Sequence, residues 1–181
     1  MTPAGERLLT TASELFYTRG IHAVGVDLIA ELAGTTKKTL YDRFGSKDNL
    51  VAMYLSRRFD RWRAFVDERL ARYSPGAGQV LAAFVTLEEW LGANTCGCAF
   101  VNANAEIGGT DHPGVTVIRA EKQWMRERYT QLVHAAGLPE WLGAQLHLLH
   151  EGAIVAQTAG GHADALANAK SAARTLLAAA G

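Results

Sequence analysis

Apolar residues recur every three or four positions through most of this 181-residue sequence, and that spacing constrains the fold more than any other feature. The longest such series runs from Leu55 through Phe59, Trp62 and Val66 to Leu70. This period matches one face of an α-helix. No segment alternates apolar and polar residues for long enough to predict a β-strand. The sequence therefore predicts an all-α protein of about nine helices.

Glycines and hydroxyl side chains mark the ends of the predicted helices in the N-terminal part. Gly34 follows a short helix over about residues 27–33, as expected of a residue that ends helices. Thr36 is placed to cap the next short helix, over about residues 37–44. Ser46 is placed to cap a long helix after it. Two short helices joined by a tight turn therefore precede a long one.

Charge is divided unevenly about the clearest break in the sequence, Ser74-Pro75-Gly76. The whole chain has no net charge, with 18 basic and 18 acidic residues. Residues 1–75 hold 12 of the basic and 9 of the acidic residues, whereas residues 76–181 hold 6 and 9. Residues 35–63 alone hold 8 basic and 3 acidic residues. Because a charged partner responds to the local potential, the neutral total does not exclude nucleic acid.

Several classes of protein are not expected from this composition. No apolar run approaches the ~18–20 residues that a membrane span needs, and the first residues lack the basic and apolar regions of a signal peptide. We expect no membrane partner and a cytoplasmic location. The two cysteines, Cys96 and Cys98, cannot form a disulfide framework. No phosphate-binding glycine loop or nucleophile motif is present, so we expect neither a cofactor nor catalytic residues.

The two short helices and the turn at Gly34 have the spacing of a helix-turn-helix, whose second helix lies in the major groove of DNA. Apolar residues of both helices can pack inward and leave polar residues facing out. Cationic and short polar side chains can reach base edges, and hydroxyls and lysines can bind phosphate oxygens. The candidate DNA contacts are Thr36, Lys37, Lys38, Tyr41, Asp42, Arg43 and Lys47. From spacing alone, an ordinary corner between two helices fits equally well.

Three motifs with fixed spacing lie between residues 8 and 50. They are Ala12-x2-Leu15-Phe16-x3-Gly20, Val26-x2-Ile29-Ala30-x2-Ala33-Gly34 and Thr39-Leu40-Tyr41-x2-Phe44-x-Ser46-Lys47-x2-Leu50. With these motifs the segment resembles the N-terminal domain of TetR/AcrR-type transcriptional regulators. The resemblance implies a helix-turn-helix domain over residues 1–46. It also implies a connecting helix with an effector-binding and dimerisation domain over residues 47–181.

The same resemblance implies a homodimer that binds a palindromic operator in double-stranded DNA and is released by a small molecule. Carried over by position, Lys37 and Lys38 would approach bases or nearby phosphates. Thr36, Tyr41 and Lys47 would hold the DNA backbone, with Asp42 and Arg43 at the edge of the groove. Gly25, Thr35 and Arg43 depart from the usual family residues.

Aromatic and polar residues of the C-terminal part are candidates for an effector pocket, because small-molecule sites combine apolar walls with a few polar anchors. The candidates are Phe65, Phe84, Trp90, Phe100, Asn104, Trp124, Tyr129 and His147, with Asn102, Glu106 and Gln157 as further polar anchors. These side chains predict an apolar or aromatic effector. For any one of the aromatic residues, a place in the ordinary core is the alternative.

Residues 152–181 contain 12 alanines and 4 glycines, and such small residues let helices approach closely. We predict that these helices form a seam with a second copy of the chain. The predicted seam residues are Gly152, Ala153, Ala156, Ala169, Ala173 and Leu176. A helical hairpin within one chain is the alternative.

Two further features leave other functions open. His147, His150 and Glu151 share one helical face and could ligate a metal in a small all-α metal-binding module or enzyme, although no further ligand follows at a recognised spacing. Cys96 and Cys98 could make a regulator responsive to oxidants. An activator with the same DNA-binding domain is also compatible with the sequence.

Overall fold

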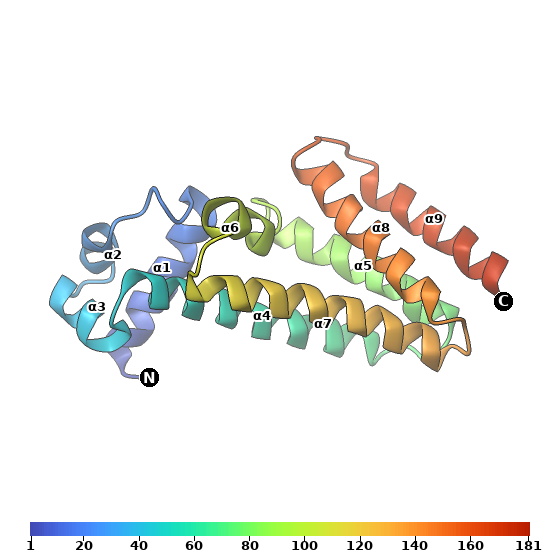
Figure 1. Cartoon of the computed structure of the whole chain (residues 1–181), viewed down its shortest axis with the longest axis horizontal. Helices are drawn as coiled ribbons and strands as arrows, with labels where there is room; N and C mark the ends of the chain where they lie inside the picture. Colours follow the sequence, from blue (N-terminus) through green and yellow to red (C-terminus); the bar gives the residue numbers. More distant parts are fainter. The chain divides into compact units, whose positions relative to one another are not determined.

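The computed structural model describes all residues from 1 to 181. The chain forms nine α-helices and no strand, which confirms the all-α prediction (Figure 1). None of the helices combines the length and the apolar character that a membrane span requires. The helices are α1 (Pro3–Arg19), α2 (Val26–Leu32), α3 (Lys37–Phe44), α4 (Lys47–Leu70), α5 (Ala77–Ala93), α6 (Ala99–Ile107), α7 (Pro113–Ala135), α8 (Trp141–Thr158) and α9 (Ala165–Ala180).

Hydroxyl caps begin α3 and α4 as the sequence predicts. At the start of α3, Thr36 Oγ1 accepts the N–H of Thr39 at 3.1 Å. At the start of α4, Ser46 Oγ accepts the N–H of Asn49 at 3.0 Å. Both caps satisfy amides that have no partner within the helix. α1 ends at Gly20, whose φ of 90° lies where a side chain would be strained.

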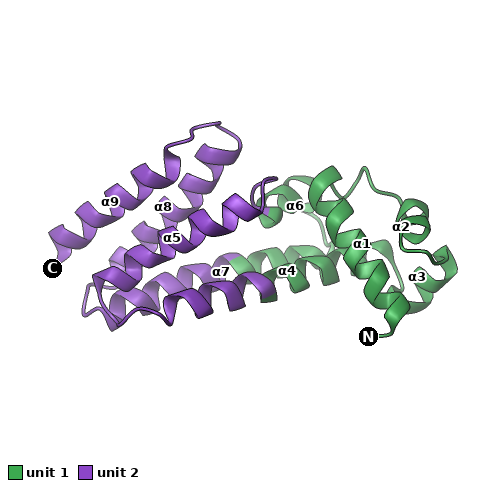
Figure 2. Ribbon diagram, turned by 180° about the vertical axis from the view of Figure 1, so that it is seen from behind, with its two compact units in different colours: residues 1–60, 99–121 green, residues 61–98, 122–181 purple.

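Two compact units make up the chain (Figure 2). Unit 1 consists of residues 1–60 and 99–121, and unit 2 consists of residues 61–98 and 122–181. This grouping differs from the division between residues 46 and 47 that the family resemblance implies, because α6 and the start of α7 pack with the N-terminal helices. The functional division of the chain remains a prediction.

Unit 1 has a core to which α1, α2, α3, α4 and α6 all contribute. Leu8 of α1, Ile29 of α2 and Leu40 of α3 are fully buried in it. Phe100 of α6 meets Phe59 of α4 edge to face, with ring centroids 6.4 Å apart. α6 is therefore packed into the same unit as the helix-turn-helix.

Unit 2 has a core shared by the last part of α4, α5, α8, α9 and the C-terminal part of α7. Phe84 and Tyr129 lie in this core with almost no exposed surface. α8 and α9 run side by side as a hairpin (Figure 1), and Ala173 is fully buried there. Some of the small residues of α8 and α9, such as Ala153, Ala169 and Ala173, thus serve packing within one chain.

Candidate nucleic-acid interface and regulatory core

The helix-turn-helix of unit 1 presents the polar side of α3 to solvent. Leu40 and Phe44 are buried on its inner side, where α3 contacts α1 and α2. Lys37, Lys38 and Tyr41 are exposed on the other side. Burial of the apolar side fixes the rotation of the helix, because a turn of α3 about its axis would expose both apolar residues.

The basic residues of α3 make only exposed ion pairs. Lys37 Nζ donates to Asp27 Oδ2 of α2 at 3.1 Å, and Lys38 Nζ donates to Asp42 Oδ2 at 2.7 Å. Arg43 is exposed at the end of the helix. Exposed pairs of this kind contribute about 0–1 kcal/mol, so either lysine can exchange its carboxylate for a DNA phosphate at low cost.

Lys47 lies at a different place from the other candidate DNA contacts. Its Nζ donates to the carbonyl of Ile21, between α1 and α2, at 2.7 Å and lies 5.9 Å from the centre of the Phe16 ring. The ammonium group therefore already has a partner inside unit 1. Its contact with a DNA phosphate remains a prediction.

Two positioning contacts of the helix-turn-helix were not anticipated from the sequence. Arg7 Nε of α1 donates to the carbonyl of Ala33 at 3.1 Å and so satisfies the C-terminal end of α2. Glu106 of α6 accepts the N–H groups of Ile21 and His22. Both contacts join residues far apart in the sequence, and no local spacing signals either of them.

The candidate effector residues divide between the two units. Phe100 and Asn104 belong to unit 1, where Phe100 packs in the core. They are therefore separate from the aromatic candidates that cluster in unit 2. The other six candidates all lie in unit 2. Trp62, which the sequence analysis did not select, lies at the centre of this cluster, because its ring centroid is 5.1 Å from that of Trp90 and 6.3 Å from that of Phe65.

Polar side chains form a cluster beside these rings, in which Tyr129 and His150 are buried and Lys122, His147 and Glu151 are partly buried. The Tyr129 hydroxyl and His150 Nδ1 share a hydrogen bond of 3.0 Å. Lys122 Nζ lies 2.9 Å from both carboxylate oxygens of Glu151, and His147 Nε2 lies 3.5 Å from Oε1 of the same carboxylate. The cluster joins α7 to α8.

Burial and charge set the protonation of this cluster. Burial raises the pKa of Tyr129 well above its ordinary value, and the nearby Glu151 carboxylate raises it further. Burial also favours the neutral form of His150 and lowers its pKa to about 3. For Glu151, burial alone would raise the pKa, but the facing His147 and Lys122 outweigh it and lower the pKa to about 2.

These partners do not arrange His147, His150 and Glu151 as a metal site. Nδ1 of His150 is used by Tyr129, and the carboxylate of Glu151 is used by Lys122. No group of three or more His, Cys, Asp or Glu side chains is arranged to hold a metal ion. The structure thus lends no support to the metal-dependent alternative.

Cys96 and Cys98 are both free thiols. Cys96 is exposed, and Cys98 is partly buried beside the core of unit 2. The ammonium group of Lys122 lies 3.6 Å from Cys98 Sγ. A response of these thiols to oxidants stays a prediction.

The predicted seam residues also divide into two groups. Ala153, Ala169 and Ala173 are buried within the chain, as the hairpin alternative proposed, whereas Gly152 is exposed. Ala156 and Leu176 are partly exposed.

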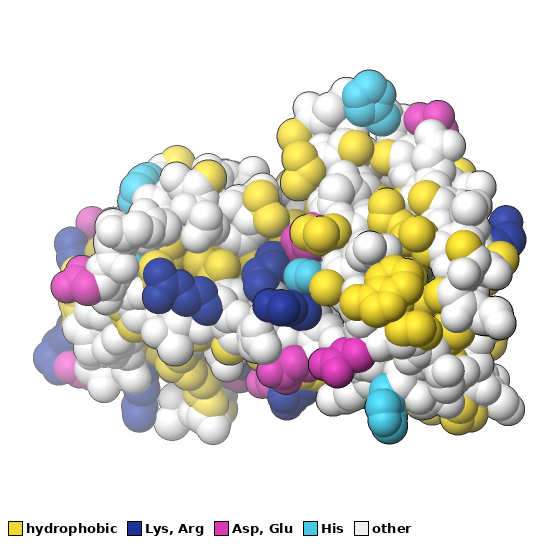
Figure 3. All heavy atoms as spheres, turned by 45° about the vertical axis from the view of Figure 1, so that its right-hand side comes forward, with side chains coloured by type: hydrophobic (Ala, Val, Ile, Leu, Met, Phe, Trp, Pro, Cys, Tyr) yellow, Lys and Arg dark blue, Asp and Glu magenta, His cyan; other side chains and the backbone are white.

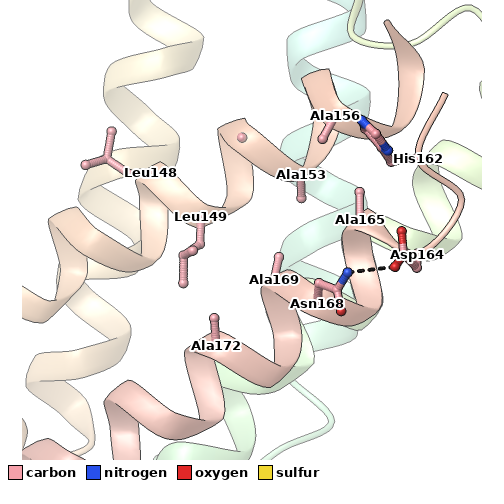
Figure 4. Close-up of a pocket in the computed structure, with 11 residues that line it drawn as sticks. Leu148, Leu149, Ala153, Ala156, His162, Asp164, Ala165, Asn168, Ala169 and Ala172 are labelled. Atoms are coloured by element: carbon pink, nitrogen blue, oxygen red, sulfur yellow. Dashed lines mark hydrogen bonds between the residues drawn. The ribbon is translucent and has the colours of Figure 1, made fainter. Parts of the chain in front are cut away.

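A groove of about 560 Å³ runs between α8 and α9. Figure 4 shows side chains from both helices pointing towards one another across this groove, with Leu149 on the α8 side and Ala169 and Ala172 on the α9 side. Asn168 Nδ2 donates to Asp164 Oδ2 at 2.9 Å at one end of it.

Fold and site together define a class: an all-α regulator with a helix-turn-helix that exposes a polar second helix. Residues 8–53 match the family model described as bacterial regulatory proteins of the tetR family. Over its whole length the chain is similar to the crystal structure of a TetR-family transcriptional regulator from Streptomyces coelicolor. The identity is 32%, the TM-score is 0.88, and the match covers 98% of this chain and 96% of that one. The chain therefore belongs to the TetR family of DNA-binding transcriptional regulators, which are regulators rather than enzymes.

Two curated relatives match parts of the chain. The transcriptional repressor KstR2 of Rhodococcus jostii is 30% identical over 127 residues, which cover 69% of this chain and 54% of that protein. The transcriptional activator FasR of Mycolicibacterium smegmatis is 48% identical over 61 residues, which cover 32% of this chain and 28% of that protein. The chain thus spans about half the length of the first relative and less of the second.

Proposed function

We propose that this protein is a dimeric repressor that binds a palindromic operator and leaves it when a small molecule binds unit 2. The observation that carries the proposal is the polar side of α3, which the buried Leu40 and Phe44 hold outward in a helix-turn-helix. A helix presented in this way fits the major groove. The longer match with a repressor than with an activator supports repression as the mode of regulation.

The proposed roles of the DNA contacts follow from their positions. Lys37 and Lys38, at the start of α3, reach base edges or the nearest phosphates after releasing their exposed carboxylate partners. Thr36 and Tyr41 donate hydroxyl hydrogen bonds to phosphate oxygens. Lys47 contacts the DNA backbone, and Asp42 and Arg43 lie at the edge of the groove.

We place the effector in unit 2, among the aromatic residues Phe65, Trp90 and Trp124 and beside His147. We assign Phe84 and Tyr129, which are almost fully buried, to the inner side of this site. A site with this lining selects an apolar or aromatic compound, with the polar cluster at His147 available to orient it.

We infer that the dimer forms through the exposed side of α8 and the groove beside α9. Leu148 and Val155 are large apolar side chains exposed on α8, seven residues apart and therefore on one side of the helix. Figure 3 shows hydrophobic side chains gathered on the part of the surface that α8 and α9 form. The small residues Gly152 and Ala156 leave room there for a second copy of the chain, and Leu176 of α9 is a further partly exposed apolar side chain.

A gel-shift experiment tests DNA binding by the proposed residues. Wild-type protein should shift a DNA fragment from upstream of its own coding sequence at low salt. Lys37→Ala combined with Tyr41→Phe should weaken binding by roughly tenfold or more, because each lost contact is worth about 1–3 kcal/mol. The salt dependence should also become shallower, since fewer phosphates are neutralised.

The matched control removes the same kinds of group outside α3. Arg119→Ala combined with Tyr73→Phe changes two exposed residues and should leave the shift unaltered. Circular dichroism should show both double variants folded. A Lys37/Tyr41 variant that is folded and binds as wild type would overturn the assignment of α3 as the reading helix.

A further inference from the structure

Glu106 holds the connection between α1 and α2 with both oxygens of its carboxylate. Oε1 accepts the N–H of Ile21 at 2.7 Å, and Oε2 accepts the N–H of His22 at 2.6 Å. Hydrogen bonds to an ionised acceptor are roughly twice as strong as neutral ones. Glu106 lies 84 residues or more beyond these amides in the sequence, so the contact is tertiary.

The position of this carboxylate depends on Gly20. A Cβ at Gly20 would lie 3.2 Å from Glu106 Oε1, closer than an ordinary contact, and the φ of +90° would strain any side chain there. The missing side chain lets the carboxylate approach the backbone. α1 therefore ends at a residue that both reverses the chain and leaves room for Glu106.

The peptide groups of Ile21 are held on both sides. Its N–H binds Glu106 of α6, and its carbonyl accepts Lys47 Nζ of α4 at 2.7 Å. Ile21 itself is buried in unit 1. Two helices from outside the helix-turn-helix thus fix the residue that connects α1 to the segment leading into α2.

α6 is in turn fixed within unit 1. Ala103 and Ile107 on this helix are each 2% exposed, and Phe100 packs against Phe59. Glu106 therefore extends from a rigid support, and it can restrain the connection more firmly than a side chain on a mobile loop could.

We propose that Glu106 is a positioning residue for operator binding, which sets where α2 and the reading helix α3 lie relative to α1. This inference rests on the proposed function. Reading base edges requires α3 to be placed within a fraction of an ångström, whereas attraction to phosphates along any DNA does not. Loss of the carboxylate should therefore reduce specific binding and leave non-specific binding unchanged.

The experiment compares Glu106→Ala, Glu106→Gln and the wild type on two DNA fragments of equal length at one salt concentration. One fragment is the upstream fragment that wild-type protein shifts, and the other is unrelated in sequence. Glu106→Ala should weaken binding to the first by about tenfold, the effect of losing charge-assisted hydrogen bonds. Binding to the second should stay within about twofold. The affinity of Glu106→Gln for the first fragment should lie between those of the wild type and Glu106→Ala, because the glutamine amide oxygen still accepts an N–H.

Hydrogen exchange of individual amides gives a second readout. The amides of Ile21 and His22 should exchange faster in Glu106→Ala, while amides in the interior of α3 keep their wild-type rates. Asp111→Asn is the matched control, because it removes one exposed carboxylate from the same segment of unit 1. It should change neither exchange nor either affinity.

Three outcomes would overturn the proposal. An equal loss of binding to both fragments by folded Glu106→Ala would show that the carboxylate does not act on operator reading in particular. Unchanged binding of Glu106→Ala to the upstream fragment would show that the contact has no positioning role. Failure of wild-type protein to bind any fragment would instead overturn the proposed function, and this inference with it.

Discussion

His150 is a titratable side chain that unit 2 buries almost completely, with 2% of its surface exposed. Burial is the main reason that its pKa falls to about 3, and the positive charge of Lys122 and the neighbouring His147 act in the same direction. Glu151 opposes them. The imidazole therefore stays neutral in the folded protein at any pH near neutrality, and it keeps its hydrogen bond with Tyr129.

This protonation predicts how stability depends on pH. Between about pH 6.5 and pH 3 the unfolded chain binds a proton at His150 that the folded chain does not. The free energy of unfolding should therefore fall as the pH decreases below 6.5, by up to about 1.4 kcal/mol per pH unit for this one proton. Urea unfolding of His150→Asn between pH 5 and pH 8 should show a shallower slope below pH 6.5, because asparagine can still bond to Tyr129 but does not titrate.

The control for this prediction is His134→Asn, which removes an exposed histidine at the end of α7. Its pH profile should match that of the wild type. An identical slope in wild type and His150→Asn would contradict the assigned protonation of the buried imidazole.

Sequence reasoning placed His147, His150 and Glu151 on one side of a helix, and the structure agrees in that respect. The hydrogen-bond partners of these residues could not be predicted from the sequence, because Tyr129 and Lys122 come from α7 and lie 21 and 29 residues away from His150 and Glu151. A shared helical face is compatible with a metal site and with a buried hydrogen-bonded cluster. Only the tertiary packing of α7 on α8 distinguishes the two.

At the scale of helices, α7 and α8 approach closely at Gly143. A Cβ placed there would lie 2.8 Å from the Cα of Thr130 and 3.0 Å from its backbone nitrogen. Because these are backbone atoms of a helix, they cannot rotate away as the end of a side chain would. Gly143 thus fixes the distance between two helices that also share the buried polar cluster.

We predict that Gly143→Ala destabilises the protein by about 1–3 kcal/mol, since the overpacked helices must separate. The higher helix propensity of alanine, about 1 kcal/mol, offsets only part of this loss. Gly92→Ala in α5 is the matched control, because nothing lies within 4 Å of the added carbon, and it should be neutral or stabilising. Urea midpoints of the two variants measure the difference. A Gly143→Ala midpoint equal to that of Gly92→Ala would contradict the close approach.

The helices themselves could largely be predicted from the sequence, because their ends are local signals. Thr36 and Ser46 cap α3 and α4 through side-chain bonds to amides three residues on. The membership of α6 in unit 1 could not be predicted, since it depends on contacts such as Glu106 with Ile21. The role of the small residues was likewise ambiguous from the sequence. Ala173 would suit a seam between two chains, but the structure buries it in the hairpin of α8 and α9 within one chain.

At the scale of the whole molecule, the proposed function requires two copies of the chain. A reading helix covers only part of an operator. The two half-sites of a palindromic operator lie about one helical turn or more apart, so recognition requires two reading helices at a fixed separation. The exposed side of α8 offers the surface for this pairing. Leu148 has 70% of its surface exposed, and Gly152 and Val155 lie on the same side of the helix.

Leu148→Glu should therefore produce a monomer, because a carboxylate buried at the centre of an apolar seam loses its hydration without gaining a partner. Size-exclusion chromatography with light scattering should show half the wild-type mass, and binding to the upstream fragment should weaken at least tenfold because a single reading helix remains.

Tyr73→Glu introduces the same charge at another exposed, large side chain, after α4, and should leave both mass and DNA binding unchanged. If Leu148→Glu remains dimeric and binds like wild type, the pairing surface lies elsewhere. If it becomes monomeric with unchanged DNA affinity, operator binding does not require the dimer, and the proposed recognition of a palindromic operator by two copies of the chain fails.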